Sequence, residues 1–68
     1  MNVANAKIYA FVAEAERMAE FVRLGLITRS IAADYLSEAA VYNQLYYEYG
    51  ADYVQSILAA AFASQAAA

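Results

Sequence analysis

Residues 24–36 read LGLITRSIAADYL, and this stretch divides the chain into helices. Gly25 fits the end of a first helix, because glycine adopts the left-handed conformation of a helix C-terminus without steric cost. Thr28 or Ser30 fits the N-cap of the next helix, because a hydroxyl can accept a hydrogen bond from a free amide of the first turn. The stretch therefore predicts a helix end, a short loop and a new helix.

Gly50 marks a second break in helix-forming composition, and the chain holds no proline and no third glycine. Asp52 and Gln55 follow it three residues apart, a variant of the capping box with aspartate in place of serine or threonine. The sequence thus predicts three helices with short loops, at about residues 3–24, 29–49 and 53–64, and a frayed C-terminal tail.

Composition supports helices throughout the 68 residues. Alanine supplies about a quarter of the chain, and no stretch alternates apolar and polar residues as a strand would. A chain of this length is sufficient for one domain, and short loops make successive helices neighbours in space. We therefore expect an all-α fold, either a small three-helix bundle or an open helical array, over residues 1–68.

The first and third predicted helices each carry one apolar stripe at helical spacing. In the first, the stripe comprises Ile8, Phe11, Val12, Ala15, Met18, Ala19 and Val22. In the third, it comprises Val54, Ile57, Leu58, Ala61 and Phe62. These two stripes are the predicted core faces.

The second predicted helix is apolar on two sides, which indicates either a sandwiched helix or an external contact face. On its first side lie Ile31, Tyr35, Tyr42, Leu45 and Tyr49, and roughly opposite lie Leu36, Ala40 and Tyr47. We predict that the side chains that point mainly inward are Ile31, Tyr35, Leu45 and Tyr49. We predict a protein-binding surface made of Phe21, Leu36, Asn43, Tyr46 and Tyr47.

Residue types argue against catalysis and against metal or cofactor binding. The chain has no histidine, cysteine or tryptophan, so the commonest general base, the commonest metal ligand and the thiol nucleophile are all missing. Asp34 and Glu38 are one helical turn apart, but without histidine they fit a solvated helix face better than a di-metal site. We expect a non-enzymatic protein without catalytic, cofactor-binding or metal-binding residues.

The charge balance disfavours nucleic acids and membranes as partners. Seven acidic and four scattered basic residues leave a formal net charge of -3, whereas phosphate backbones attract clustered lysine and arginine.

The sequence also lacks the features of a membrane span or an export signal. Residues 53–68, the longest charge-free stretch, are shorter than the roughly 18 to 20 residues that span a bilayer. Glu14 and Glu16 interrupt the N-terminal stretch where an export signal would stay apolar. A cytoplasmic protein is expected.

Residues 42–53, YNQLYYEYGADY, hold five of the seven tyrosines. A chain of this size buries only about 60% of the surface that its unfolded form exposes, yet 65% of its residues are hydrophobic. Tyrosine joins a broad apolar ring to a hydroxyl and is enriched at protein interfaces. We expect at least one of these tyrosines to contact a partner protein.

Three runs within residues 26–62 form a further pattern: ITRSIAADYL at 27–36, AAVYNQL at 39–45 and YGADYVQSILAAAF at 49–62. They resemble the QseM-type antiactivators, very small α-helical proteins carried by mobile elements of soil bacteria. The resemblance implies a protein that binds transcriptional activators, including a LuxR-type quorum-sensing regulator, and prevents them from switching on transfer genes. It assigns no role to any single residue.

The leading hypothesis is a non-enzymatic regulator that binds and inhibits a transcriptional activator through an exposed aromatic helix face. Two alternatives stay open at this point. One is a small DNA-binding or DNA-associated factor, with Arg29 near the start of a helix that would follow a helix-turn-helix turn. The other is a self-assembling structural bundle, in which the partner is a second copy of the chain.

Overall fold

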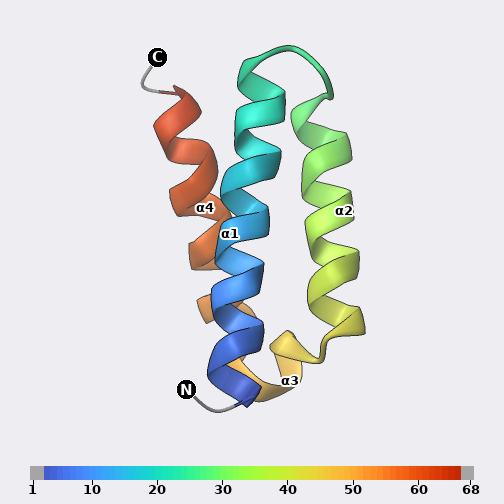
Figure 1. Cartoon of the computed structure of the whole chain (residues 1–68), viewed down its shortest axis with the longest axis vertical. Coiled ribbons are helices and arrows are strands. Elements are labelled where there is room, and N and C mark those ends of the chain that lie inside the picture. The colour runs from blue at the N-terminus through green and yellow to red at the C-terminus, as the bar shows by residue number, and fades with distance from the viewer. Residues whose placement is uncertain (1–2, 67–68) are drawn as a thin grey trace.

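The computed structural model of the chain describes residues 3–66 and shows four helices without a strand in that range. The helices are α1 (Val3–Arg23), α2 (Arg29–Tyr42), α3 (Leu45–Tyr49) and α4 (Ala51–Ala66). The three long helices run up, down and up side by side, and the short α3 crosses the lower end of the bundle between α2 and α4 (Figure 1). The predicted all-α bundle is confirmed.

The turn between α1 and α2 forms as the sequence predicts. Gly25 has a positive φ of 78°, and the chain closes α1 with hydrogen bonds from Gly25 N to Val22 O (3.0 Å) and from Leu26 N to Phe21 O (2.9 Å). This is the Schellman arrangement, which satisfies free carbonyls of the last turn. Thr28, rather than Ser30, caps α2. Its Oγ1 accepts a hydrogen bond from the amide of the third residue after it, at 3.1 Å.

The predicted second helix, 29–49, is wrong as one continuous element, because it is interrupted after Tyr42. Gln44 adopts the left-handed conformation with φ 61° and ψ 27°. Asn43 ends α2, and both its backbone N and its side-chain Nδ2 donate to Ala39 O, at 3.0 and 2.9 Å. The side-chain amide of Asn43 therefore takes part in the end of the helix.

The interruption after α2 places the side chain of Leu45 in the core. In an uninterrupted helix Leu45 would follow Ile31 by about four full turns and would share its side. The left-handed residue Gln44 rotates the chain, so that Leu45 is fully buried while Ile31 is 57% exposed. Burying this leucine offsets the cost of a left-handed non-glycine residue.

The start of α4 also differs from the prediction. The helix begins at Ala51, directly after Gly50, whose positive φ of 87° ends α3. Asp52 lies within the first turn instead of capping it, and Gln55 Nε2 donates to the Tyr46 hydroxyl at 3.0 Å. The capping box is therefore not formed. The helix extends to Ala66, slightly beyond the predicted end at about residue 64, and the last two residues of the predicted frayed tail lie outside the described part of the chain. Fraying stays a prediction.

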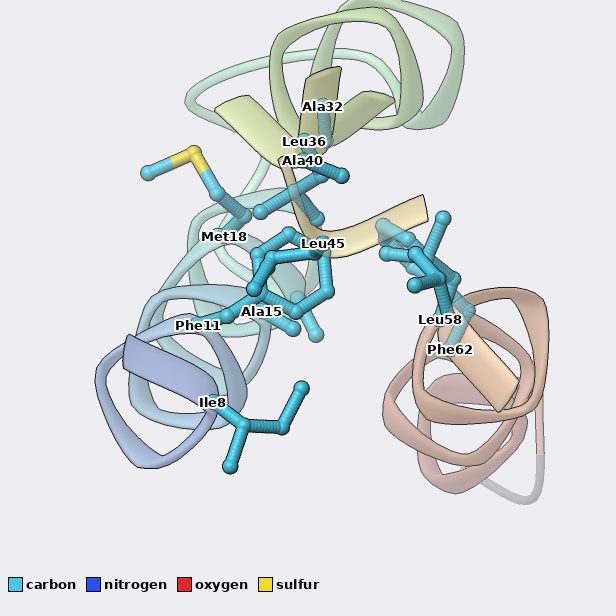
Figure 2. Packing of buried hydrophobic residues seen from close by; sticks show 12 residues of the cluster. Ile8, Phe11, Ala15, Met18, Ala32, Leu36, Ala40, Leu45, Leu58 and Phe62 are labelled. Carbon is cyan, nitrogen blue, oxygen red and sulfur yellow. The ribbon is translucent and has the colours of Figure 1, made fainter. Parts of the chain in front are cut away.

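The buried side chains form one hydrophobic cluster between the three long helices (Figure 2). Its members are Ile8, Phe11, Ala15, Met18, Ala19, Ala32, Leu36, Ala40, Leu45, Val54, Leu58 and Phe62. The predicted stripes of the first and third helices are confirmed as core faces, with Val12 and Val22 half-buried at the margin.

The inner face of α2 is the reverse of the predicted one. Ala32, Leu36 and Ala40 project from α2 toward α1 and α4 (Figure 2), and all three are completely buried. The prediction that Leu36 lies at the surface is wrong, and so is the prediction that Ile31 and Tyr35 point inward. The small alanines on either side of Leu36 permit close approach of the neighbouring helices.

Candidate functional site

The outward side of α2 carries large apolar side chains where polar ones usually meet water. Ile31, Tyr35 and Tyr42 lie on one stripe of the helix and are 57%, 47% and 87% exposed. Val41 lies next to this stripe and is also exposed. Together with two exposed carboxylates they form a surface that we call the α2 face, which consists of Ile31, Asp34, Tyr35, Glu38, Val41 and Tyr42.

The charges on the α2 face are only negative. All four basic residues of the chain precede residue 30, while Asp34, Glu38, Glu48 and Asp52 follow it. Among residues 3–66, none of these four carboxylates forms a salt bridge with a lysine or arginine. The part of the chain that follows Arg29 is therefore acidic and contains no basic residue.

The three arginines are engaged elsewhere. Arg17 pairs with Glu14 at 2.5 Å, and Arg23 pairs with the carboxylate of Glu20, both on α1. The Arg29 guanidinium lies 5.5 Å from the centroid of the Phe62 ring, and its Nη2 donates to Phe62 O at 3.4 Å. Arg29 therefore joins the start of α2 to the far part of α4.

Glu14 connects α1 to the edge of the α2 face. Its side chain lines a groove of about 290 Å³ between α1 and α2, together with Lys7 and Tyr35. Arg17 lowers the pKa of the Glu14 carboxyl most, partial burial opposes this, and the Tyr35 hydroxyl lowers it further. Oε1 of Glu14 is buried without a hydrogen-bond partner among the described residues. Glu14 in turn raises the pKa of the Tyr35 hydroxyl.

Two surface hollows are candidates for a binding role. The first is a shallow, almost wholly apolar hollow of about 400 Å³ on the α2 face, between Val41 and Tyr42 and beside Ser37 and Glu38. The second is a groove of about 490 Å³ between α1 and α4, where alanines leave space beside the half-buried Ile57. The α1–α4 groove offers no exposed aromatic side chain, whereas the α2 face offers two tyrosines. The α2 face is therefore the stronger candidate for a protein contact.

The five residues predicted for protein binding do not gather on one surface. Tyr47 is 91% exposed on α3, and Asn43 is exposed at the end of α2. Tyr46 and Phe21 are half-buried against the core, and Leu36 lies inside it. Tyr47 and Asn43 thus remain accessible contacts, while Leu36 is excluded as a direct contact.

Sequence reasoning placed Ile31 and Tyr35 inward and named neither Val41 nor Tyr42 as a binding residue. Two signals in the sequence could have found them. The first is the run Asn43-Gln44, in which asparagine favours a helix end. The second is the clustering of unpaired carboxylates with this apolar stripe, because Asp34 and Glu38 fall on the same side as Ile31 and cannot be buried without partners.

No helix among residues 3–66 combines the length and apolar character needed to cross a bilayer. The same residues contain no cluster of three acidic side chains arranged to hold a metal ion. Comparison with models of known protein families, with curated proteins and with solved structures finds no match.

Proposed function

We propose that the chain is a non-enzymatic regulator that binds a transcriptional activator and inhibits it, as an antiactivator does. The observation that carries the proposal is the α2 face, where Tyr42 leaves 87% of its surface in water. Tyrosine in such a position is a typical anchor of a protein interface. The resemblance of residues 26–62 to QseM-type proteins supplies the class of partner, a LuxR-type activator.

The chemistry of the surface agrees with protein binding rather than with reaction or DNA contact. The α2 face offers rings, aliphatic groups and two carboxylates, and a tight inhibitor needs only a few aromatic anchors. An acidic surface repels phosphate, and Arg29, the residue expected to contact DNA, is held against Phe62. Inhibition would follow if the chain covers a surface of the activator that binds DNA or RNA polymerase.

The test is a two-plasmid reporter assay. A LuxR-type activator encoded in the same genome as this chain drives a reporter from its own promoter, with or without the chain. We expect wild-type chain to reduce reporter output and the variants Tyr42→Ala and Tyr47→Ala to restore part of it. Ala59→Ser is the matched control, because Ala59 is exposed on α4, away from the α2 face, and the variant should inhibit like the wild type.

Three outcomes contradict the proposal. Reporter output that is unchanged by the chain rejects the activator as its target. A gel shift of promoter DNA by the chain alone at physiological salt supports the DNA-binding alternative instead. Sedimentation that shows a stable oligomer, whose interface protects Tyr42, supports the self-assembling bundle.

A further inference from the structure

We propose that the α2 face docks a cationic amphipathic helix of the partner protein. This inference rests on the proposed function and deepens it, since it states which kind of segment the chain recognises. Apolar side chains of the incoming helix would cover Ile31, Tyr35 and Tyr42, and its lysines or arginines would meet Asp34 and Glu38.

The dimensions of the α2 face suit a helix. From Ile31 to Tyr42 the apolar stripe spans three turns, about 16 Å at a rise of 1.5 Å per residue. Helices recognise one another through side chains repeated at three- and four-residue steps, which is the spacing of this stripe. The hollow of about 400 Å³ beside Val41 and Tyr42 lies at one end of it and can receive a large apolar side chain.

The negative charge of the α2 face favours a partner helix that carries lysine or arginine. Asp34 and Glu38 are exposed, unpaired and one turn apart, and they lie between Val41 and the Ile31 stripe. A docked helix therefore buries part of these carboxylates together with the apolar groups. Burying a carboxylate without a counter-charge is costly, so only a partner with basic side chains at matching positions compensates for the lost hydration.

The carboxylates of the α2 face also disfavour three other partners: a second copy of the chain, an anionic lipid surface and a nucleic acid. A second copy bound through its own α2 face would place carboxylates against carboxylates. Its α1 surface offers only one basic side chain outside a salt bridge, Lys7, because Arg17 and Arg23 are already paired with glutamates. Anionic lipid surfaces and nucleic acids repel an acidic face.

The test uses NMR titration of the isotopically labelled chain with synthetic peptides. The probe is a 14-residue amphipathic peptide of leucine and lysine, which matches the length of α2. The first control peptide has glutamate in place of every lysine, and the second has the same leucines and lysines in a scrambled, non-amphipathic order. We expect only the probe to bind, with shift changes centred on residues 31–42 and with affinity that falls as salt increases.

A matched pair of charge variants locates the contact. Glu38→Gln and Glu16→Gln each remove one exposed glutamate from the middle of a helix, the first on the α2 face and the second beside the α1–α4 groove. We expect Glu38→Gln to weaken the probe about two- to fivefold, as for an exposed ion pair, and Glu16→Gln to leave the affinity unchanged.

The proposal is overturned if the probe does not bind, if all three peptides bind equally, or if the shift changes centre on the α1–α4 groove. It is also overturned if Glu16→Gln weakens the probe as much as Glu38→Gln does. Its failure is distinguishable from failure of the proposed function. Reporter inhibition without probe binding rejects only the docking mode, and probe binding without reporter inhibition rejects only the activator as partner.

Discussion

Leu36 and Tyr42 lie six residues apart on α2, and replacing each with alanine should have opposite consequences. Leu36 has no exposed surface and lies in the cluster between the three long helices, whereas Tyr42 is 87% exposed. We predict that Leu36→Ala destabilises the fold and that Tyr42→Ala leaves it intact while weakening partner binding.

The magnitudes follow from burial. Replacing a buried leucine with alanine costs about 2 to 5 kcal/mol, and a domain of this length has roughly 3 to 10 kcal/mol of stability in total. A tyrosine that is 87% exposed buries about 25 Å² of a side chain of about 200 Å², worth about 0.6 kcal/mol. The better helix propensity of alanine offsets part of that loss, so the net change in Tyr42→Ala should be below about 0.5 kcal/mol.

Thermal unfolding followed by circular dichroism measures both variants. Leu36→Ala should lower Tm by at least about 8 °C, and Tyr42→Ala by less than about 4 °C. Leu36→Met, which keeps the side-chain volume, serves as a control and should cost less than about 1.5 kcal/mol. The reasoning is refuted if Tyr42→Ala lowers Tm as much as Leu36→Ala does, because α2 would then present its other side to the core.

Three further predictions concern the local structure. Gly50→Val should lower the free energy of unfolding by about 1 to 3 kcal/mol in chemical denaturation, because φ 87° with ψ 153° is a conformation that valine avoids. An unchanged free energy of unfolding would contradict this backbone geometry. Thr28→Ala should cost about 1 kcal/mol through the lost N-cap, whereas Thr28→Ser should cost little in the same assay. Arg17 and Tyr35 lower the pKa of the Glu14 carboxyl, so its stabilising effect is present above its ordinary pKa of 4.5 and is lost as pH falls through the lowered value. Stability of Glu14→Gln should therefore decrease less between about pH 5 and about pH 2 than that of the wild type, and parallel curves would show that Glu14 is not perturbed.

The helices and most of the core follow from local signals. Gly25 and Thr28 specify the first turn through the chemistry of a single residue each, and the stripes of α1 and α4 keep a regular helical period from end to end. Such features depend on neighbours in the sequence. They are therefore the ones that sequence analysis predicts correctly.

The candidate site could not be predicted in the same way, because it depends on the interruption at Gln44. With a continuous helix, Leu45 and Ile31 share a side, and the strongly apolar Leu45 assigns that side to the core. Asn43 signals a helix end, but the left-handed conformation of Gln44 is favoured by the burial of Leu45, a tertiary interaction that local helix propensity does not include. This interruption therefore explains why Ile31 and Tyr35, which the prediction placed inward with Leu45, lie on the outer side of α2.

The most direct test of the α2 face is a cross-saturation NMR measurement on the labelled chain in complex with the proposed LuxR-type activator. Saturation transferred from the unlabelled activator reports which residues of the chain lie at the interface. The account predicts the strongest transfer at Ile31, Tyr35 and Tyr42, and little at Ala60 in the α1–α4 groove. Strong transfer confined to Ala60 and its neighbours would contradict it.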